Sequence, residues 1–175
     1  MMLNLEYVGT VRLDACSNVL WRLPAQGHHS ISQTDDGTFW IPGGEWSTDV
    51  NNLGNYPGFP SRFWMSKILH VSQGGNVIGE INITDVLLES KLAWHIPKVW
   101  NLGGIGQDPV HINDVEPLPR SIAESYPTFE KGDLMVSARH INLVFVMDPV
   151  SRKIKWEFSR HLIDQHDPDF IGGGG

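Results

Sequence analysis

Short runs of β-branched and aromatic residues, separated by turn-forming residues, dominate the pattern of hydrophobic and polar positions. Such runs predict β-strands over Tyr7–Leu13, Val19–Leu23, Thr38–Pro42, Phe63–Val71, Val77–Ile83, Leu134–Ser137, Leu143–Asp148 and Ile154–Phe158. Clusters of Asp, Gly, Ser and Pro between the runs predict tight turns. Helix signals are few: one short helix is predicted over Asp85–Trp94, and Ser121–Glu124 has the capping-box spacing that opens a single turn. The pattern therefore predicts an all-β fold.

A weak internal repeat relates several of these strands. One hairpin spans residues 11–21 and ends in Trp, a second spans 146–156 and also ends in Trp, and a third, without the Trp, spans 68–79. Each hairpin leads through a connection to a segment that carries histidine. These histidines are His28 with His29, His111 and His166.

The order of hairpin, connection and histidine-bearing strand is the path of the chain through a β-propeller blade, whose first strand lines the central channel. Histidines at the same place in several blades would then meet near the axis. A blade takes about 40 to 45 residues, so the chain has room for about three blades beside its long loops over 43–60 and 89–109. Three blades do not close a propeller ring, so the ring would be open. We therefore expect residues 1–175 to be a partial β-propeller of four-stranded antiparallel blades, a single-domain piece of a longer protein.

Composition and charge exclude some classes of protein. The formal net charge is -7 and the pI is about 5.5. No cluster of Lys and Arg is present, which disfavours nucleic-acid binding because phosphate neutralisation needs such clusters. Cys16 is the only cysteine, so an intrachain disulfide is excluded. The first residues lack the basic and apolar regions of a signal peptide, and no apolar run is long enough to span a bilayer.

Residues 108–168 carry a series of short motifs. They are H-x-N at His111 and Asn113, S-x-R at Ser137 and Arg139, a hairpin over 148–156, and Gln165 followed by His166. A further histidine-bearing segment lies upstream, over 27–42. In this order the motifs resemble the bacterial arylsulfotransferases that need no nucleotide sulfate donor, over nearly the whole chain from about Val11 to Ile171. The chain departs from that pattern at residues 120–130, which look inserted.

This resemblance implies both a fold and an activity. The family fold is a six-bladed propeller, of which this chain would supply about three blades. The partners would be small molecules, an aryl sulfate donor and a phenol acceptor, with no cofactor. The resemblance also favours a periplasmic or extracellular location.

Sulfuryl transfer places negative charge on the oxygens of the moving group, so catalysis needs cationic and hydrogen-bonding side chains around it. By resemblance, His166 is the nucleophile that becomes transiently sulfated, a role suited to an imidazole that is uncharged near neutral pH. The planar fork of Arg139 fits a tetrahedral oxyanion. His111 and Asn113 stand two apart and would share one face of a strand, where they bind sulfate oxygens or polarise the phenol oxygen. His140, next to Arg139, would face the other way and is assigned a structural role.

His28 and His29 are adjacent, so on a strand only one of them faces the channel. We favour His29 as the group that takes or gives the phenol proton, with His28 as the alternative and a weaker candidate for substrate contact. The remaining histidines are interpreted as surface or half-buried residues, namely His70, His95 and His161. The tryptophans assigned to blade cores are Trp21, Trp40, Trp64 and Trp156.

Two other functions compete with the transferase. Several histidines on one channel could bind zinc, but the chain has no H-x-H or H-x3-H pair, and Arg139 would repel the cation, so no metal ligands are predicted. A non-enzymatic propeller could instead bind a ligand or a protein through its loops. The aromatic loop over 43–60, with Trp46, Tyr56 and Phe59, fits that role, and it would equally fit the wall of an acceptor pocket.

Overall fold

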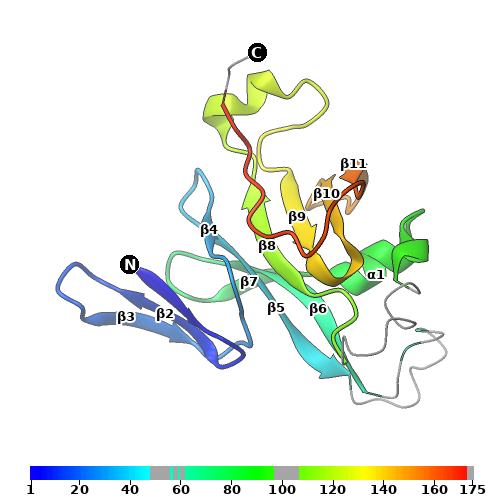
Figure 1. The fold of residues 1–175 in the computed structure, drawn as a ribbon. Coiled ribbons are helices and arrows are strands. Elements are labelled where there is room, and N and C mark those ends of the chain that lie inside the picture. Colours follow the sequence, from blue (N-terminus) through cyan, green and yellow to red (C-terminus); the bar gives the residue numbers. More distant parts are fainter. Residues whose placement is uncertain (48–55, 57–58, 60–61, 97–106, 173–175) are drawn as a thin grey trace.

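The computed structural model describes residues 1–47, 56, 59, 62–96 and 107–172, and it is mostly β (Figure 1). The strands form three antiparallel sheets, each a meander in which sequence neighbours pair. Two of the sheets have four strands and the first has three. The prediction of an all-β fold is confirmed, and none of the sheets closes on itself within the described residues.

The first sheet holds β1 (Met2–Leu5), β2 (Gly9–Leu13) and β3 (Val19–Leu23). The second sheet holds β4 (Ser32–Gln33), β5 (Phe39–Ser47), β6 (Phe63–Val71) and β7 (Val77–Asn82). The third sheet holds β8 (Ile112–Pro117), β9 (Leu134–Ala138), β10 (Leu143–Met147) and β11 (Ile154–Phe158). The helical elements are α1 (Ile83–Leu88) and short 3₁₀ turns over Ala93–His95, Arg120–Ser125 and Arg139–Ile141. Among the described residues, no helix is both long and apolar enough to cross a membrane.

The three predicted hairpins are all present, and they share one construction. In β2–β3, β6–β7 and β10–β11 the register shifts just before the turn. The shifts occur at Arg12/Leu13, His70/Val71 and Val146/Met147. In each turn the last residue but one has a positive φ, and these residues are Ser17 (67°), Gly75 (84°) and Arg152 (61°). A bulge followed by a left-handed residue gives each hairpin the same local twist.

The main core lies between the second and third sheets. Alternate residues of β9 and β10 point into it, among them Val136 and Phe145, and they meet Trp40 and Phe63 from the second sheet. Helix α1 packs into the same core through Val86 and its neighbours. This packing holds β8 against β5 and β4 and so fixes where the loops before β4 and β8 lie.

The opposite face of the third sheet is also covered, so β9 and β10 are buried on both sides. Met135 and Val144 on this face pack against the segment that looked inserted in the sequence, through Tyr126 and Phe129. The C-terminal segment crosses the same face with Phe170, whose N–H donates to Glu116 at 2.8 Å (Figure 1). Strands that are covered on both faces have continuous apolar sequences, and β10 is an example.

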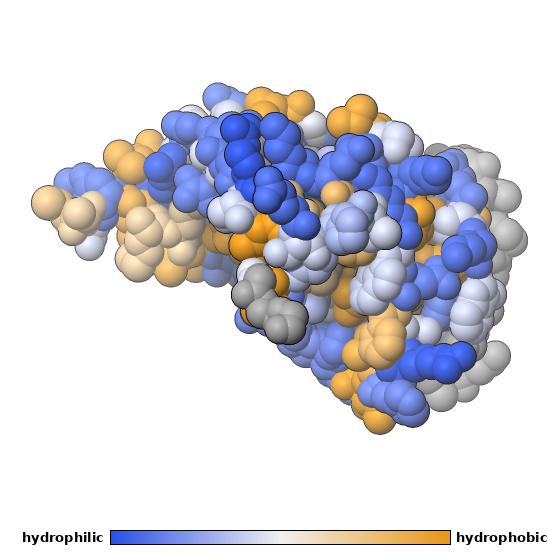
Figure 2. Space-filling model, turned by 90° about the horizontal axis from the view of Figure 1, so that it is seen from above, coloured by the Kyte–Doolittle hydropathy of each residue, from blue (hydrophilic) through white to orange (hydrophobic). Residues whose placement is uncertain are grey.

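The surface is mostly hydrophilic on the face seen from above, where hydrophobic residues form separate patches (Figure 2). Exposed large apolar side chains of the first sheet include Leu3, Leu5, Val19 and Leu20. This sheet stands apart from the main core and packs on the second sheet through a smaller cluster that includes Leu23 and Phe39.

Several predicted boundaries were wrong. The segment predicted as one strand over 7–13 begins with a turn in which Tyr7 has a φ of 59°, and β1 precedes it. Residues 43–47, predicted as loop, extend β5, and the rest of that loop, apart from residues 56 and 59, lies outside the described residues. The predicted helix over 85–94 ends at Leu88, since the Ser90 hydroxyl donates to the Leu87 carbonyl and accepts from the Leu92 N–H. The single turn over 120–125 is confirmed.

Two side-chain environments also differ from expectation. Trp156 is 43% exposed, because β11 is an edge strand and its outer face is largely uncovered, whereas Trp40 and Trp64 are buried as predicted. Trp21 is partly buried and donates from its indole N–H to the Gln73 carbonyl at 2.9 Å. His95, predicted at or near the surface, is buried.

Replacing Phe145 tests the main core. Its side chain is 0% exposed, so Phe145→Ala leaves a cavity between the sheets and should lower the free energy of unfolding by about 3–5 kcal/mol. Phe158→Ala, at a position 42% exposed, is the matched control and should cost less than about 1 kcal/mol. Urea denaturation measures both variants, and equal losses would contradict the placement of the core.

Candidate functional site

Histidines from four separate segments meet at the end of the third sheet where β8 begins. The imidazole of His111 is central: its Nε2 lies 3.1 Å from Nε2 of His29. The ring of His28 stacks near one side of His111 with centroids 5.6 Å apart, and the ring of His140 stacks on it at 4.4 Å. The ring of His166 lies 5.9 Å from that of His29. We call these five residues the histidine cluster.

The backbone places these histidines beside the inner strands and not on them. His29 and His111 have φ of 57° and 50°, left-handed values that a strand cannot contain, and each stands in the loop that leads to an inner strand. Two predictions from strand alternation are therefore wrong. His28 and His29 both join the cluster, and His111 does not share a strand face with Asn113, because β8 starts at Ile112 and bulges after it.

His140 also belongs to the cluster, although the sequence assigned it a place away from Arg139. The reason is again local backbone structure: Arg139 opens a 3₁₀ turn, so its neighbour is not directed to the opposite face as it would be in a strand. Hydrogen bonds from the Arg139 and His140 N–H groups to the His111 and Val110 carbonyls tie this turn to the start of β8.

Asp108 orients the central histidine. Its carboxylate accepts from the His111 backbone N–H at 3.0 Å and lies 2.7 Å from Nδ1 of the same residue. A carboxylate only accepts, so the His111 proton stands on Nδ1, and Nε2 is left to accept from the Nε2–H of His29. Asp108 also receives a hydrogen bond from His140 Nδ1 at its carbonyl, at 2.7 Å. One residue thus fixes two imidazoles.

His166 is exposed, and its tautomer is also fixed. Nδ1 lies 2.9 Å from the carbonyl oxygen of Asp164, which only accepts, so Nδ1 carries the proton and Nε2 carries a lone pair. Arg139 lies nearby, with Nη2 3.4 Å from the Asp164 carboxylate. The exposed end of the cluster therefore combines an imidazole lone pair with a guanidinium.

Asn113 and Gln165 fix the segment that carries His166. Asn113 is 4% exposed and donates from Nδ2 to the Gln165 carbonyl at 2.6 Å. The Gln165 amide donates in turn to the Ser137 hydroxyl and to the Ala138 and Leu143 carbonyls, each at 3.2 Å. These contacts make Asn113 a positioning residue for His166.

His28 is the most buried member of the cluster. It is 0% exposed, and neither ring nitrogen has a hydrogen-bond partner within the part of the chain that the structure describes. Its ring is stacked between those of Tyr7 and His111, at 5.2 and 5.6 Å. Burial, followed by the neighbouring His29 and His111, lowers the pKa of His28 to about 4, although Asp108 and Glu6 act in the opposite direction.

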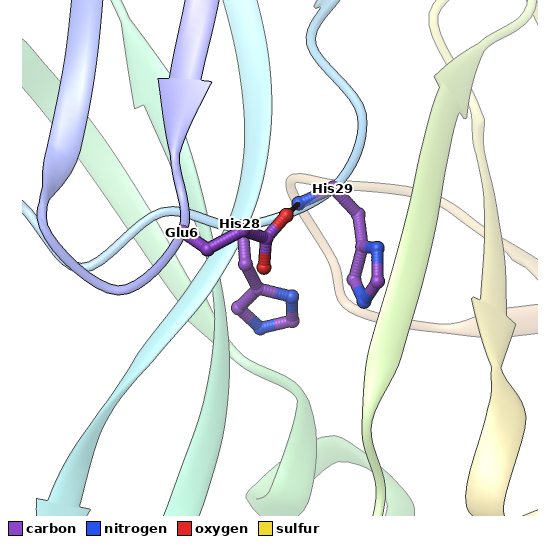
Figure 3. Close-up of side chains that lie close together, drawn as sticks. All are labelled: Glu6, His28 and His29. Carbon is purple, nitrogen blue, oxygen red and sulfur yellow. Dashed lines mark hydrogen bonds between the residues drawn. The ribbon is translucent and has the colours of Figure 1, made fainter.

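Charged side chains of opposite sign lie at the two ends of the cluster. Glu6 accepts from the His29 backbone N–H at 3.0 Å and stands beside the buried end (Figure 3). Burial is the largest effect on His29 and lowers its pKa; Glu6 raises that pKa, whereas Arg139 lowers it from the other side. The cluster therefore has a carboxylate at its buried end and a guanidinium at its exposed end.

An acidic cleft of about 300 Å³ adjoins the site, and Asp114, Glu116 and Asp167 are among its lining residues. Asp114 is buried, which raises its pKa to about 7; Asp167 and Glu116 add to this increase, and a hydrogen bond with Ser30 opposes it. The cleft is thus a poor place for an anion, in contrast to the side of the cluster near Arg139.

Sequence reasoning missed some of these residues. Asp108 stands three residues before His111, a spacing that allows one side chain to cap both the backbone and the ring of the other, and this signal was available. Glu6 and Tyr7 are remote in the sequence and come to the cluster only through the turn between β1 and β2, so nothing local pointed to them.

Imidazoles with fixed tautomers beside a guanidinium form the kind of site that binds an anionic group and offers it a neutral nucleophile. This chemistry agrees with the comparison to protein families. The chain belongs to the arylsulfotransferase (ASST) family, whose model matches residues 7–172. Membership indicates a transferase that acts on small aryl substrates. No curated protein and no solved structure matches the chain.

Asp114 should make stability depend on pH. Because its folded pKa of about 7 lies above the ordinary value of 3.8, the folded state binds the proton more tightly, and stability is lost as the pH rises from about 4 through 7. Asp114→Asn should remove that loss, so the melting temperature of the variant should fall less than that of the parent between pH 5 and pH 8. An equal fall in melting temperature between pH 5 and pH 8 for the two proteins would contradict the assignment.

Proposed function

We propose that this protein is an aryl sulfotransferase that moves a sulfuryl group from an aryl sulfate donor to a phenol through a transient sulfohistidine at His166. The observation that supports it best is the convergence of His29, His111 and His166 with Arg139 from segments far apart in sequence. The family membership supports the same chemistry.

In the first step, the Nε2 lone pair of His166 attacks the sulfur of the donor. An N–S bond forms, the bond from sulfur to the aryl oxygen breaks, and the phenolate leaves with the electron pair. The proton stays on Nδ1, where it is hydrogen-bonded to the Asp164 carbonyl, and the ring spreads the positive charge that develops. Arg139 binds the sulfuryl oxygens, whose negative charge grows in the transition state.

In the second step, the acceptor phenol attacks the sulfur of sulfated His166. The N–S bond breaks, the lone pair returns to Nε2, and an aryl sulfate is formed. The phenol proton passes to the imidazole of His29, whose Nε2–H is held by His111 and, through it, by Asp108. His111 thus orients the base, and Asn113 keeps the His166 segment in place.

We further propose that these sheets are blades of a six-bladed propeller. Three features support this. The second and third sheets are four-stranded meanders, β8 packs against the second sheet chiefly at β5 and also at β4, and a histidine stands in the loop before each of the first strands β4 and β8. The shared construction of the three hairpins supports the same repeat.

Loss of the nucleophile tests the proposed reaction. His166→Ala should lower transfer from a chromogenic aryl sulfate to a phenol by at least about 10³-fold, because the covalent route then has no acceptor nitrogen. Exposed His161→Ala is the matched control and should retain activity. The assay should use the longest natural protein that contains this chain.

A second measurement makes that test specific. Incubation of the parent protein with donor alone should add the mass of one SO3 group to the peptide that holds His166. Full transfer by His166→Ala, or the label on another residue, would reject the nucleophile assignment. Absence of transfer in the parent protein would favour a binding module instead.

A further inference from the structure

The buried end of the histidine cluster contains an imidazole whose surroundings do not satisfy it. His28 is 0% exposed, yet among the described residues neither of its ring nitrogens has a hydrogen-bond partner. A neutral imidazole carries one N–H and one lone pair, and burying both unpaired costs free energy. Buried polar groups are nearly always paired, so this nitrogen pair points to a partner that the described part of the chain does not provide.

Two other potential ligands stand next to His28. Glu6, on the turn between β1 and β2, and His29 each bring one ligand atom, and the three atoms lie within 4.8 Å of one another. Figure 3 shows the Glu6 carboxylate and both imidazoles around one space, with the carboxylate held by the His29 N–H. Glu6 is exposed, so its carboxylate is accessible to an ion from solvent.

We propose that Glu6, His28 and His29 bind a divalent transition-metal ion, with zinc as the best match. Two imidazoles and one carboxylate are a common ligand set for zinc, and they leave a fourth position open to water. A bound ion would be the partner of one ring nitrogen of His28 and would offset the free-energy cost of burying that nitrogen unpaired. The site was not foreseen in the sequence because Glu6 reaches it only through the fold.

The charges nearby favour a cation at this end of the cluster. Glu6 and Asp108 both act on His28 as negative neighbours. Arg139, which the sequence analysis expected to repel a metal, lies at the exposed end and pairs with Asp164 at 3.4 Å. The two ends therefore suit opposite ligands, a metal ion beside Glu6 and an anionic group beside Arg139.

The site shares His28 and His29 with the proposed transfer site, but its test does not depend on sulfuryl transfer. An ion held by His29 would compete with the role of that imidazole as a base, so occupancy would regulate the reaction. A second group, Asp108, His111 and His140, also brings ligand atoms within 4.8 Å. In that group Nδ1 of His111 and Nδ1 of His140 are both hydrogen-bonded to Asp108. The first group instead contains the buried ring of His28, which is unpaired among the described residues, so we assign the ion to the first group.

Zinc titration tests the proposal directly. The 175-residue chain, without a histidine tag, is titrated with Zn²⁺ against a chromogenic chelator. One Zn²⁺ per chain should bind, and His28→Ala or Glu6→Gln should weaken binding by at least about tenfold. The visible spectrum of Co²⁺ in the same site should show the strong bands of low-coordinate nitrogen and oxygen ligation, and these bands should vanish in both variants.

Matched variants separate this site from its neighbours. His161→Ala removes an exposed histidine and should leave zinc binding unchanged, and His140→Ala removes a ligand of the second group and should do the same. Zn²⁺ should also raise the melting temperature of the parent chain but not that of Glu6→Gln, whose exposed position keeps the fold intact. Absence of stoichiometric binding, equal binding by parent and Glu6→Gln, or loss of binding in His140→Ala would each overturn the proposal.

Discussion

The packing of the second sheet against the third is the constraint on which the histidine cluster depends. Ile112 and Val115 of β8 are fully buried in the core that also contains Trp40 and Phe63. Their burial sets the start of β8 beside the loop that precedes β4. That loop is held in turn by an isolated bridge between Gly27 and Gly43, where an added Cβ on Gly43 would lie 2.8 Å from the Gln26 carbonyl oxygen. Close backbone approach at this point brings His28 and His29 to His111.

The sequence predicted much of the fold because hairpin signals are local. The runs over 19–23, 63–71 and 154–158 match their strands at both ends, and the three hairpins appear where the repeat placed them. The repeat predicted inner strands that carry the histidines, but β4 and β8 begin after His29 and His111. Ser32–Gln33 has no apolar pattern, and the stretch before it takes its shape from the sheet beside it. The family was recognised from motif order, a signal that does not require knowledge of the fold.

Four of the five histidines in the cluster were candidates from the sequence, but their geometry was not predictable. Alternation along a strand assigned opposite directions to His28 and His29, and to Arg139 and His140. Left-handed backbone at His29 and a 3₁₀ turn at Arg139 cancel that alternation. Such backbone departures depend on hydrogen bonds made across the sheets, so a pattern of residue types does not report them. The residues that polarise the cluster, Glu6 above all, are distant in sequence and share no motif with it.

The attachment of Gln165 has a mechanical consequence for its neighbour. Its side-chain amide is held by three acceptors on the third sheet, and its carbonyl is held by Asn113. The chain at this point has no regular secondary structure, yet four hydrogen bonds hold the residue immediately before His166 to the third sheet. The exposed imidazole therefore projects from a fixed main-chain position, and its own hydrogen bond to the Asp164 carbonyl sets the direction of the ring. A ring held in this way presents the same nitrogen to each molecule that arrives.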